Sequence, residues 1–160
     1  MGSDSISRIH FVAAQLTVII AVIHLSLGVL NWTRWLMAGF LVPRDLRWPL
    51  FVVSGAAMII GLFVAAAGRY RRLLYAGGIV LMAGYILGYF GWHLSGHRPL
   101  LLLGAGTQHR GPLLPFLLDH LLAGPVVFLA LVSEFALLVL LLYLLVTESG
   151  TRRIVSRGSP

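Results

Sequence analysis

Four long apolar stretches occupy most of the 160-residue chain, and they constrain its fold more than any other feature. They run from about 9 to 31, 48 to 67, 73 to 92 and 116 to 146. Each is close to or longer than the roughly 20 residues that a helix needs to cross the hydrocarbon core of a bilayer. The sequence therefore predicts an all-α fold, an integral membrane four-helix bundle.

The composition indicates the same class and restricts the chemistry. Hydrophobic residues make up 59% of the chain and charged residues 11%, and a soluble core cannot use that much apolar surface. The absence of Cys excludes disulfides, thiolate catalysis and Cys-ligated zinc or iron–sulfur centres. Any metal site must therefore use His, carboxylate or carbonyl ligands.

The net charge of +7 comes entirely from Arg at the ends of the apolar stretches, which indicates membrane topology rather than nucleic-acid binding. Four crossings place both termini and the second turn on one side, with seven Arg there and five opposite. The seven are Arg8, Arg69, Arg71, Arg72, Arg152, Arg153 and Arg157, and the five are Arg34, Arg44, Arg47, Arg98 and Arg110. The positive-inside rule then predicts that both termini are cytoplasmic. We expect the protein in the plasma membrane.

The predicted organisation is one transmembrane domain, 1–148, followed by a basic, poorly ordered cytoplasmic tail, 149–160. The first stretch is interpreted as a retained helix, because it is too long for a signal peptide. The Trp- and Arg-containing segment 31–48 is typical of the membrane interface, and the Gly- and Pro-interrupted loop 95–115 predicts a cap over the outer helix ends. Small residues predict close helix packing. They are Ala57, Gly61, Ala65, Gly84 and Gly88.

Four polar side chains fall at matching depths in the predicted helices. At 1.5 Å per residue they lie roughly 16 to 20 Å above the inner boundary of their helices; they are His24, Ser54, Tyr85 and Glu134. A carboxylate at that depth costs at least about 2.5 kcal/mol, so it needs a partner. We expect His24 to pair with Glu134, and Tyr85 to donate a hydrogen bond to the pair.

Helical phase extends this polar layer towards the outer surface. Four side chains of the third helix recur every four residues and form a stripe. They are Tyr85, Tyr89, His93 and His97. On the fourth helix His120 lies fourteen residues before Glu134 and nearly in phase with it, and Asp119 is adjacent. The pattern predicts a polar track from the outer mouth to the middle of the membrane.

The first functional hypothesis is a redox-associated subunit that binds a cofactor. A quinone pocket needs a His, Tyr or carboxylate within an apolar slot, which the central His, Tyr and Glu would supply. A haem b needs two axial His at similar depth on facing helices, and His93 or His97 with His120 meets that requirement. The cofactor-binding candidates are Tyr89, His93, Asp119 and His120.

Three further hypotheses remain open. Proton transfer would use His24 and Glu134, but the inner half of the first helix offers only Gln15 and Thr17, on nearly opposite faces. A metal site at the outer mouth would use His93, His97 and His120. The alternatives without chemistry are interfacial His satisfied by water and a structural subunit whose polar layer fixes helix register.

Three segments give a family resemblance: IHLSLG in the first helix, then FVVSGAAMIIG, then GRYRRLLYAGGI. Their order resembles the small four-helix DoxX-like membrane proteins, over about Leu16 to Trp92. The resemblance implies quinone-coupled sulfur or redox chemistry and transfers no catalytic residue; the loop with His97 and His109 departs from the pattern. The prediction is a small redox-associated subunit that handles a quinone or protons, contacting the lipid bilayer and other membrane subunits or copies of itself.

Overall fold

The computed structural model describes residues 3–41, 45–96 and 112–157, and within these ranges the chain forms five helices and no strand. The helices are α1 (Ser3–Met37), α2 (Arg47–Ala66), α3 (Arg71–Leu94), α4 (Leu113–Ala123) and α5 (Pro125–Arg157). By length and composition α1, α2, α3 and α5 can each cross a membrane. The prediction of an all-α chain with four apolar membrane-length helices is confirmed.

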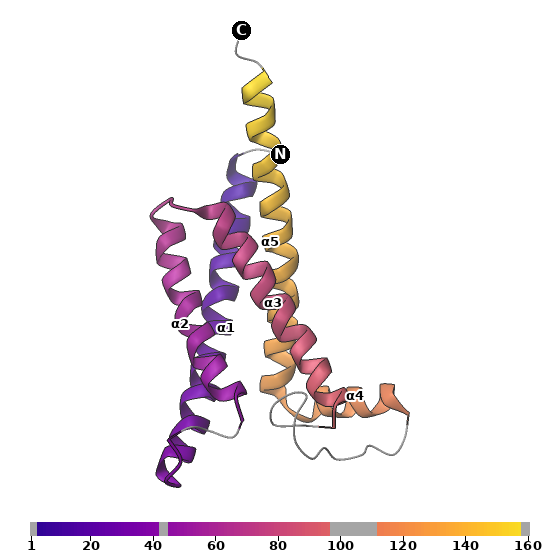
Figure 1. Ribbon diagram of the computed structural model, residues 1–160. Helices are drawn as coiled ribbons and strands as arrows, with labels where there is room; N and C mark the ends of the chain where they lie inside the picture. Colours follow the sequence, from indigo (N-terminus) through magenta and orange to yellow (C-terminus); the bar gives the residue numbers. More distant parts are fainter. Residues whose placement is uncertain (1–2, 42–44, 97–111, 158–160) are drawn as a thin grey trace.

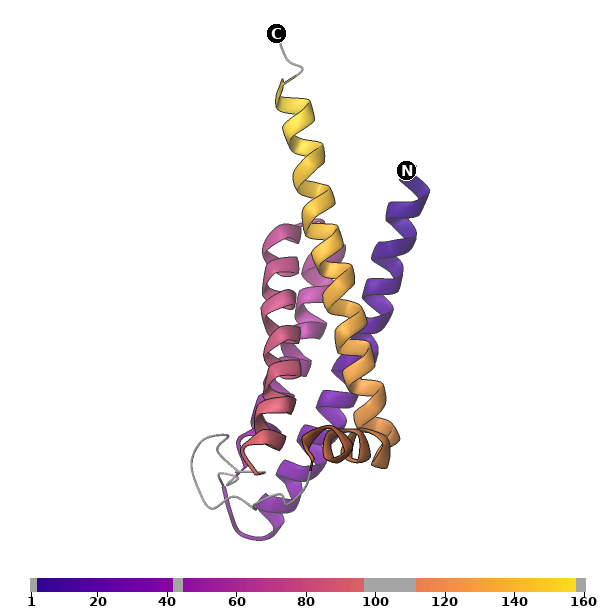
Figure 2. The same ribbon diagram turned by 90° about the vertical axis from the view of Figure 1, so that its right-hand side faces the viewer.

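The four long helices run in alternating directions (Figure 1). The closest neighbours are α1 with α2 and α3 with α5, and α1 packs against α5 to join the two pairs. Both termini lie at one end of the molecule, here called the termini end. Helix α4 lies across the opposite end, the far end, at a steep angle to α5 (Figure 2).

The expected single helix from 116 to 146 is wrong, because the chain there forms two helices. Gly124 is extended, with φ −130° and ψ 111°, and interrupts the helix between α4 and α5. Pro125 has no N–H to donate and disfavours a helical residue before it, so it suits the first position of a new helix. His120 therefore lies on α4, and its predicted phase with Glu134 along one helix does not apply.

Two other boundaries differ from the sequence prediction. Helix α1 continues to Met37, into the segment expected at the interface, and α5 continues to Arg157, into the expected tail. Most of the expected cap, residues 97–111, lies outside the described residues. The turn between α2 and α3 is short as predicted, and Gly68 ends α2 in the left-handed conformation with φ +74°.

Close helix packing depends on glycines other than those predicted. A Cβ on Gly28 of α1 would lie 2.8 Å from the backbone oxygen of Trp48 on α2. A Cβ on Gly78 of α3 would lie 2.6 Å from the side chain of Leu141 on α5. By contrast, no atom that would restrict a Cβ lies within 4 Å of Gly84 or Gly88, so the expected packing role of these two glycines is wrong.

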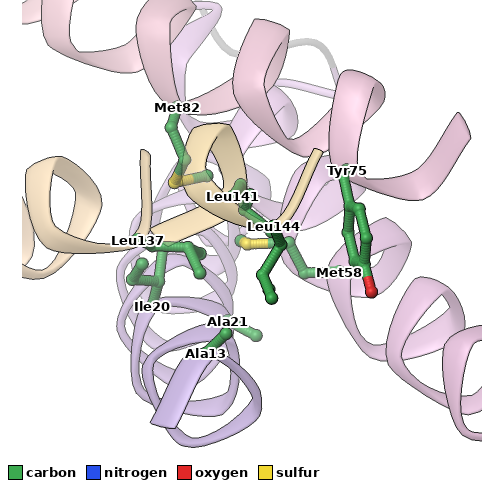
Figure 3. Close-up of a cluster of buried hydrophobic side chains, with 9 residues drawn as sticks. All are labelled: Ala13, Ile20, Ala21, Met58, Tyr75, Met82, Leu137, Leu141 and Leu144. Atoms are coloured by element: carbon green, nitrogen blue, oxygen red, sulfur yellow. The ribbon is translucent and has the colours of Figure 1, made fainter. Parts of the chain in front are cut away.

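The apolar core lies where α1, α3 and α5 meet, with one residue from α2 (Figure 3). Its side chains are all less than a tenth exposed. They are Ala13, Ile20, Ala21, Met58, Tyr75, Met82, Leu137, Leu141 and Leu144. At the far end α2 and α3 are also joined by Arg47, whose guanidinium lies 3.8 Å from the ring centroid of Trp92.

Candidate functional site

One side chain from each long helix forms a buried polar cluster, here called the central cluster: His24 (α1), Ser54 (α2), Tyr85 (α3) and Glu134 (α5). His24 Nε2 lies 2.9 Å from Glu134 Oε1. His24 is 1% exposed and Glu134 5%. The structure thus brings together the four residues that matching depth predicted, and the predicted His–Glu contact is present. The Tyr85 hydroxyl was expected to donate to this pair, but it bonds to Ser54 Oγ and the Leu50 carbonyl instead.

A hydroxyl network holds the other nitrogen of the imidazole. Tyr85 donates from its hydroxyl to Ser54 Oγ over 2.7 Å, and Ser54 Oγ lies 3.2 Å from His24 Nδ1. The rings of Phe51 and Tyr85 lie 4.7 and 4.4 Å from the imidazole centroid and exclude water from it. Hydrogen-bond partners at the ring nitrogens and contacts with these two aromatic rings therefore fix the position of the imidazole.

This geometry allows one proton to be shared. Ser54 also lies within reach of the Phe51 carbonyl, at 3.1 Å, so its hydroxyl can donate there and accept a hydrogen bond from His24 Nδ1. The proton between His24 Nε2 and Glu134 Oε1 can then reside on either atom. One position gives an ion pair and the other a neutral pair, and the heavy atoms need not move.

The predicted polar stripe continues to the far end as a pair of histidines. His93 is 4% exposed, and its ring lies edge-to-face with that of His120, with 5.3 Å between centroids. Each Nδ1 donates to the carbonyl four residues earlier, over 2.8 Å for His93 and 3.0 Å for His120. In the neutral form of each ring the lone pair is then on Nε2, as in metal-binding imidazoles.

His93 and His120 at the far end provide little of the predicted cofactor site. The two imidazoles contact each other directly, so a bis-histidine haem does not fit between them without their separation. Asp119 is exposed, and His97 lies outside the described residues. Among the residues that the structure describes, no group of three or more His, Cys, Asp or Glu is placed to hold a metal ion. Tyr89 contributes its backbone carbonyl to His93.

Sequence reasoning missed a second polar cluster, here called the termini-side cluster: His10 (α1), Tyr75 (α3) and Glu148 (α5). Tyr75 donates from its hydroxyl to Glu148 Oε1 over 3.1 Å, and the same hydroxyl lies 2.9 Å from His10 Nε2. His10 Nε2 and Glu148 Oε1 are 3.6 Å apart. The missed signal was spacing: fourteen residues separate the two His of α1 and also the two Glu of α5.

A cavity of about 850 Å³ lies between the two clusters and is lined by all four long helices. Its polar lining is His10, Thr17, Arg71 and Tyr75. The other wall residues are apolar, and they include the small residues of α2 that were expected to pack against a neighbouring helix. Those residues are Ala57, Gly61 and Ala65.

The cavity ends one helical turn short of the central cluster. Met58, Met82 and Leu137 line it there, and they follow or precede Ser54, Tyr85 and Glu134 by three or four residues. We call these three side chains the apolar layer; their exposed fractions are 7, 0 and 2%. One layer of side chains thus separates the cavity from the central cluster. Figure 3 shows these three side chains among the core residues.

Neither a family model, a curated protein sequence nor a solved structure matches this chain significantly. The resemblance to DoxX-like proteins stays a prediction. Any functional conclusion must therefore come from the fold and from the two clusters themselves.

Proposed function

We propose that this protein is a four-helix membrane subunit of the plasma membrane, with both termini in the cytoplasm. Four helices of membrane length and the position of both termini at one end support this topology. The turn between α2 and α3 carries Arg69, Arg71 and Arg72 at that same end. Short loops rich in Arg remain on the cytoplasmic side of membranes.

The proposed function is to hold and transfer protons for quinone-linked redox chemistry. The observation that carries it is the 2.9 Å contact between His24 and Glu134, both at most 5% exposed. Ionisable groups buried at such depth are costly and typically mark proton relays or substrate paths. A pair whose shared proton can occupy either partner can accept or release a proton without exposing an unpaired charge.

The cavity is the proposed quinone site. The central cluster is filled by its own side chains, whereas the cavity combines apolar walls with polar groups at one end. Arg71 would bind a carbonyl oxygen of a quinone as a hydrogen-bond donor, and the apolar walls would take its tail. Bound there, a quinone would accept two electrons and two protons to become a quinol, with electrons from a partner redox subunit.

A structural role is the second candidate, and one observation favours it. The polar groups of the central cluster hydrogen-bond to one another, a state that can fix the packing of helices without any chemistry. The double variant His24→Leu/Glu134→Leu separates the two functions, because removing both partners leaves no unpaired buried charge.

The test is proton uptake by the purified protein with a quinone bound. Reduction at an electrode in the presence of a pH-sensitive dye reports how fast protons leave the medium. We expect the double variant to fold and bind the quinone, but to take up protons more slowly than the wild type. Equal rates in the two proteins would favour the structural role.

A further inference from the structure

We propose that the termini-side cluster is a second proton-binding site, and that it exchanges protons with the central cluster through the cavity and across the apolar layer. The inference rests on the proposed proton-handling function and adds the path that sequence reasoning lacked. His10, Tyr75 and Glu148, which are not part of the central cluster, thereby acquire a role.

The two clusters repeat one arrangement at two depths. Because α1 and α5 are antiparallel, His24 meets Glu134 while His10 meets Glu148, and each pair adds a Tyr from α3. Fourteen residues of helix correspond to about 21 Å. The His and the Glu therefore recur about four turns apart and in register on α1 and α5, whereas the two Tyr of α3 are ten residues apart.

The clusters differ in exposure, as a relay requires. The side chains of His10 and Glu148 are 30 and 27% exposed, whereas those of His24 and Glu134 are 2 and 6% exposed. Protons from the medium can therefore reach the termini-side cluster directly. The central cluster has to exchange its proton through other groups.

The hydroxyl of Tyr75 links the termini-side pair. It donates to Glu148, so its oxygen can accept from His10 Nε2. A proton can pass from protonated His10 to the Tyr75 oxygen while the hydroxyl proton passes to the Glu148 carboxylate. The His10 N–H bond and the original phenol O–H bond break as a new phenol O–H bond and a Glu148 O–H bond form, so the phenol ends neutral. The reverse transfer returns the proton to His10, which lines the cavity.

Polar groups on one face of α1 mark the rest of the path. Thr17 lies seven residues from both His10 and His24, so the three share a face of the helix. Thr17 lines the cavity and donates its hydroxyl proton to Ala13 O, which leaves its oxygen able to accept from a water. Water bound there would connect the termini-side cluster to the apolar layer.

The apolar layer is the barrier in this path. It is one turn thick, about 5 Å along the helices. Two of its three side chains are Met58 and Met82, and methionine has three rotatable bonds and adapts its shape easily. Rotation of these side chains would let a water bridge the cavity and the central cluster, so the layer sets the rate of exchange.

The experiment measures hydrogen–deuterium exchange at the ring nitrogen of His24 by NMR, in full-length protein labelled with ¹⁵N-histidine. Gly77 and Gly84 provide a matched pair: both are on α3 with no restricting atom within 4 Å of an added Cβ, but only Gly77 lines the cavity. We expect Gly77→Leu to slow exchange at His24, and Gly84→Leu to leave it unchanged.

A second pair tests the relay itself. Tyr75→Phe removes the linking hydroxyl and should slow exchange at His24 roughly tenfold, the effect of one lost hydrogen-bonded step. Tyr143→Phe changes a half-buried tyrosine that does not line the cavity, and it should have no such effect. Exchange that is equally fast in all four variants and in the wild type would overturn the proposal.

Failure of this inference is distinguishable from failure of the proposed function. If the central cluster takes its protons from another side than the termini-side cluster, the four variants exchange like the wild type, while the double variant at His24 and Glu134 still slows proton uptake by the quinone in the cavity. If the central cluster is only structural, the double variant takes up protons as fast as the wild type.

Discussion

The central and termini-side clusters both combine a His of α1, a Tyr of α3 and a Glu of α5, but the central cluster adds Ser54 of α2 and the surroundings of the two differ. In the central cluster, His24 and Glu134 are enclosed and in hydrogen-bond contact, at 2.9 Å. In the termini-side cluster, His10 and Glu148 are 3.6 Å apart and about a quarter to a third exposed. Burial, rather than residue identity, therefore decides how strongly each pair is coupled and what its loss costs.

The largest difference should appear when one partner of each pair is removed. Glu134→Leu leaves a buried imidazole unpaired and should lower the free energy of unfolding by about 3–5 kcal/mol. Glu148→Leu removes a partly exposed partner and should cost less than about 1 kcal/mol. Thermal or denaturant unfolding in detergent measures both. Equal losses would show that the two clusters do not differ in coupling.

Removing both partners of the central pair should recover most of the free energy of unfolding that is lost when Glu134 alone is replaced. His24→Leu/Glu134→Leu removes both buried polar partners, so its stability should return to within about 1–2 kcal/mol of the wild type. A double-mutant cycle on the same unfolding assay gives the coupling energy. Additive losses in the double variant would contradict a direct interaction between the two side chains.

Helix spacing sharpens the comparison, because Gly78 brings α3 close to α5 near the termini-side cluster. Gly78→Ala should cost about 1–3 kcal/mol through its clash with Leu141. Gly84→Ala, on the same helix, should be neutral or stabilise by about 0.5–1 kcal/mol, because alanine favours helix and space is free. Unfolding of the two variants side by side measures the difference.

Loss of single hydroxyls should give the smallest effects. Tyr85→Phe removes a donor to buried Ser54 and should cost about 1–1.5 kcal/mol, whereas Tyr75→Phe, beside more exposed partners, should cost about 0.5 kcal/mol. The order of the two unfolding midpoints is the measurement. A larger loss for Tyr75→Phe would mean that the termini-side cluster is the more tightly held of the two.

The sequence predicted the central cluster because helices of membrane length cross the same bilayer. The position of a residue along its helix therefore gives its depth in the membrane. That reasoning located His24, Ser54, Tyr85 and Glu134 without knowledge of which helices touch. It missed His10 and Glu148 because they lie at the ends of the predicted apolar stretches 9–31 and 116–146, where polar residues are expected at the membrane interface. Their partner Tyr75 lies only five residues into α3.

Other features were beyond the sequence for physical reasons. Hydropathy does not distinguish an apolar helix that crosses a membrane from one that lies across the end of the helix bundle. The sequence prediction therefore merged α4 with α5, despite Gly124 and Pro125. Small residues indicate where helices can approach but not where they do. Gly78 marks a close contact, whereas Gly61 lines the cavity.

The most direct test of a shared proton between His24 and Glu134 is infrared spectroscopy of the purified protein. The carboxyl band of Glu134 is identified by its absence in Glu134→Gln, and its protonated and ionised forms absorb at different frequencies. We predict that His24→Gln shifts this band and its distribution between the two forms, while His10→Gln leaves it unchanged. A Glu134 band that is identical in wild type and His24→Gln would contradict the shared proton.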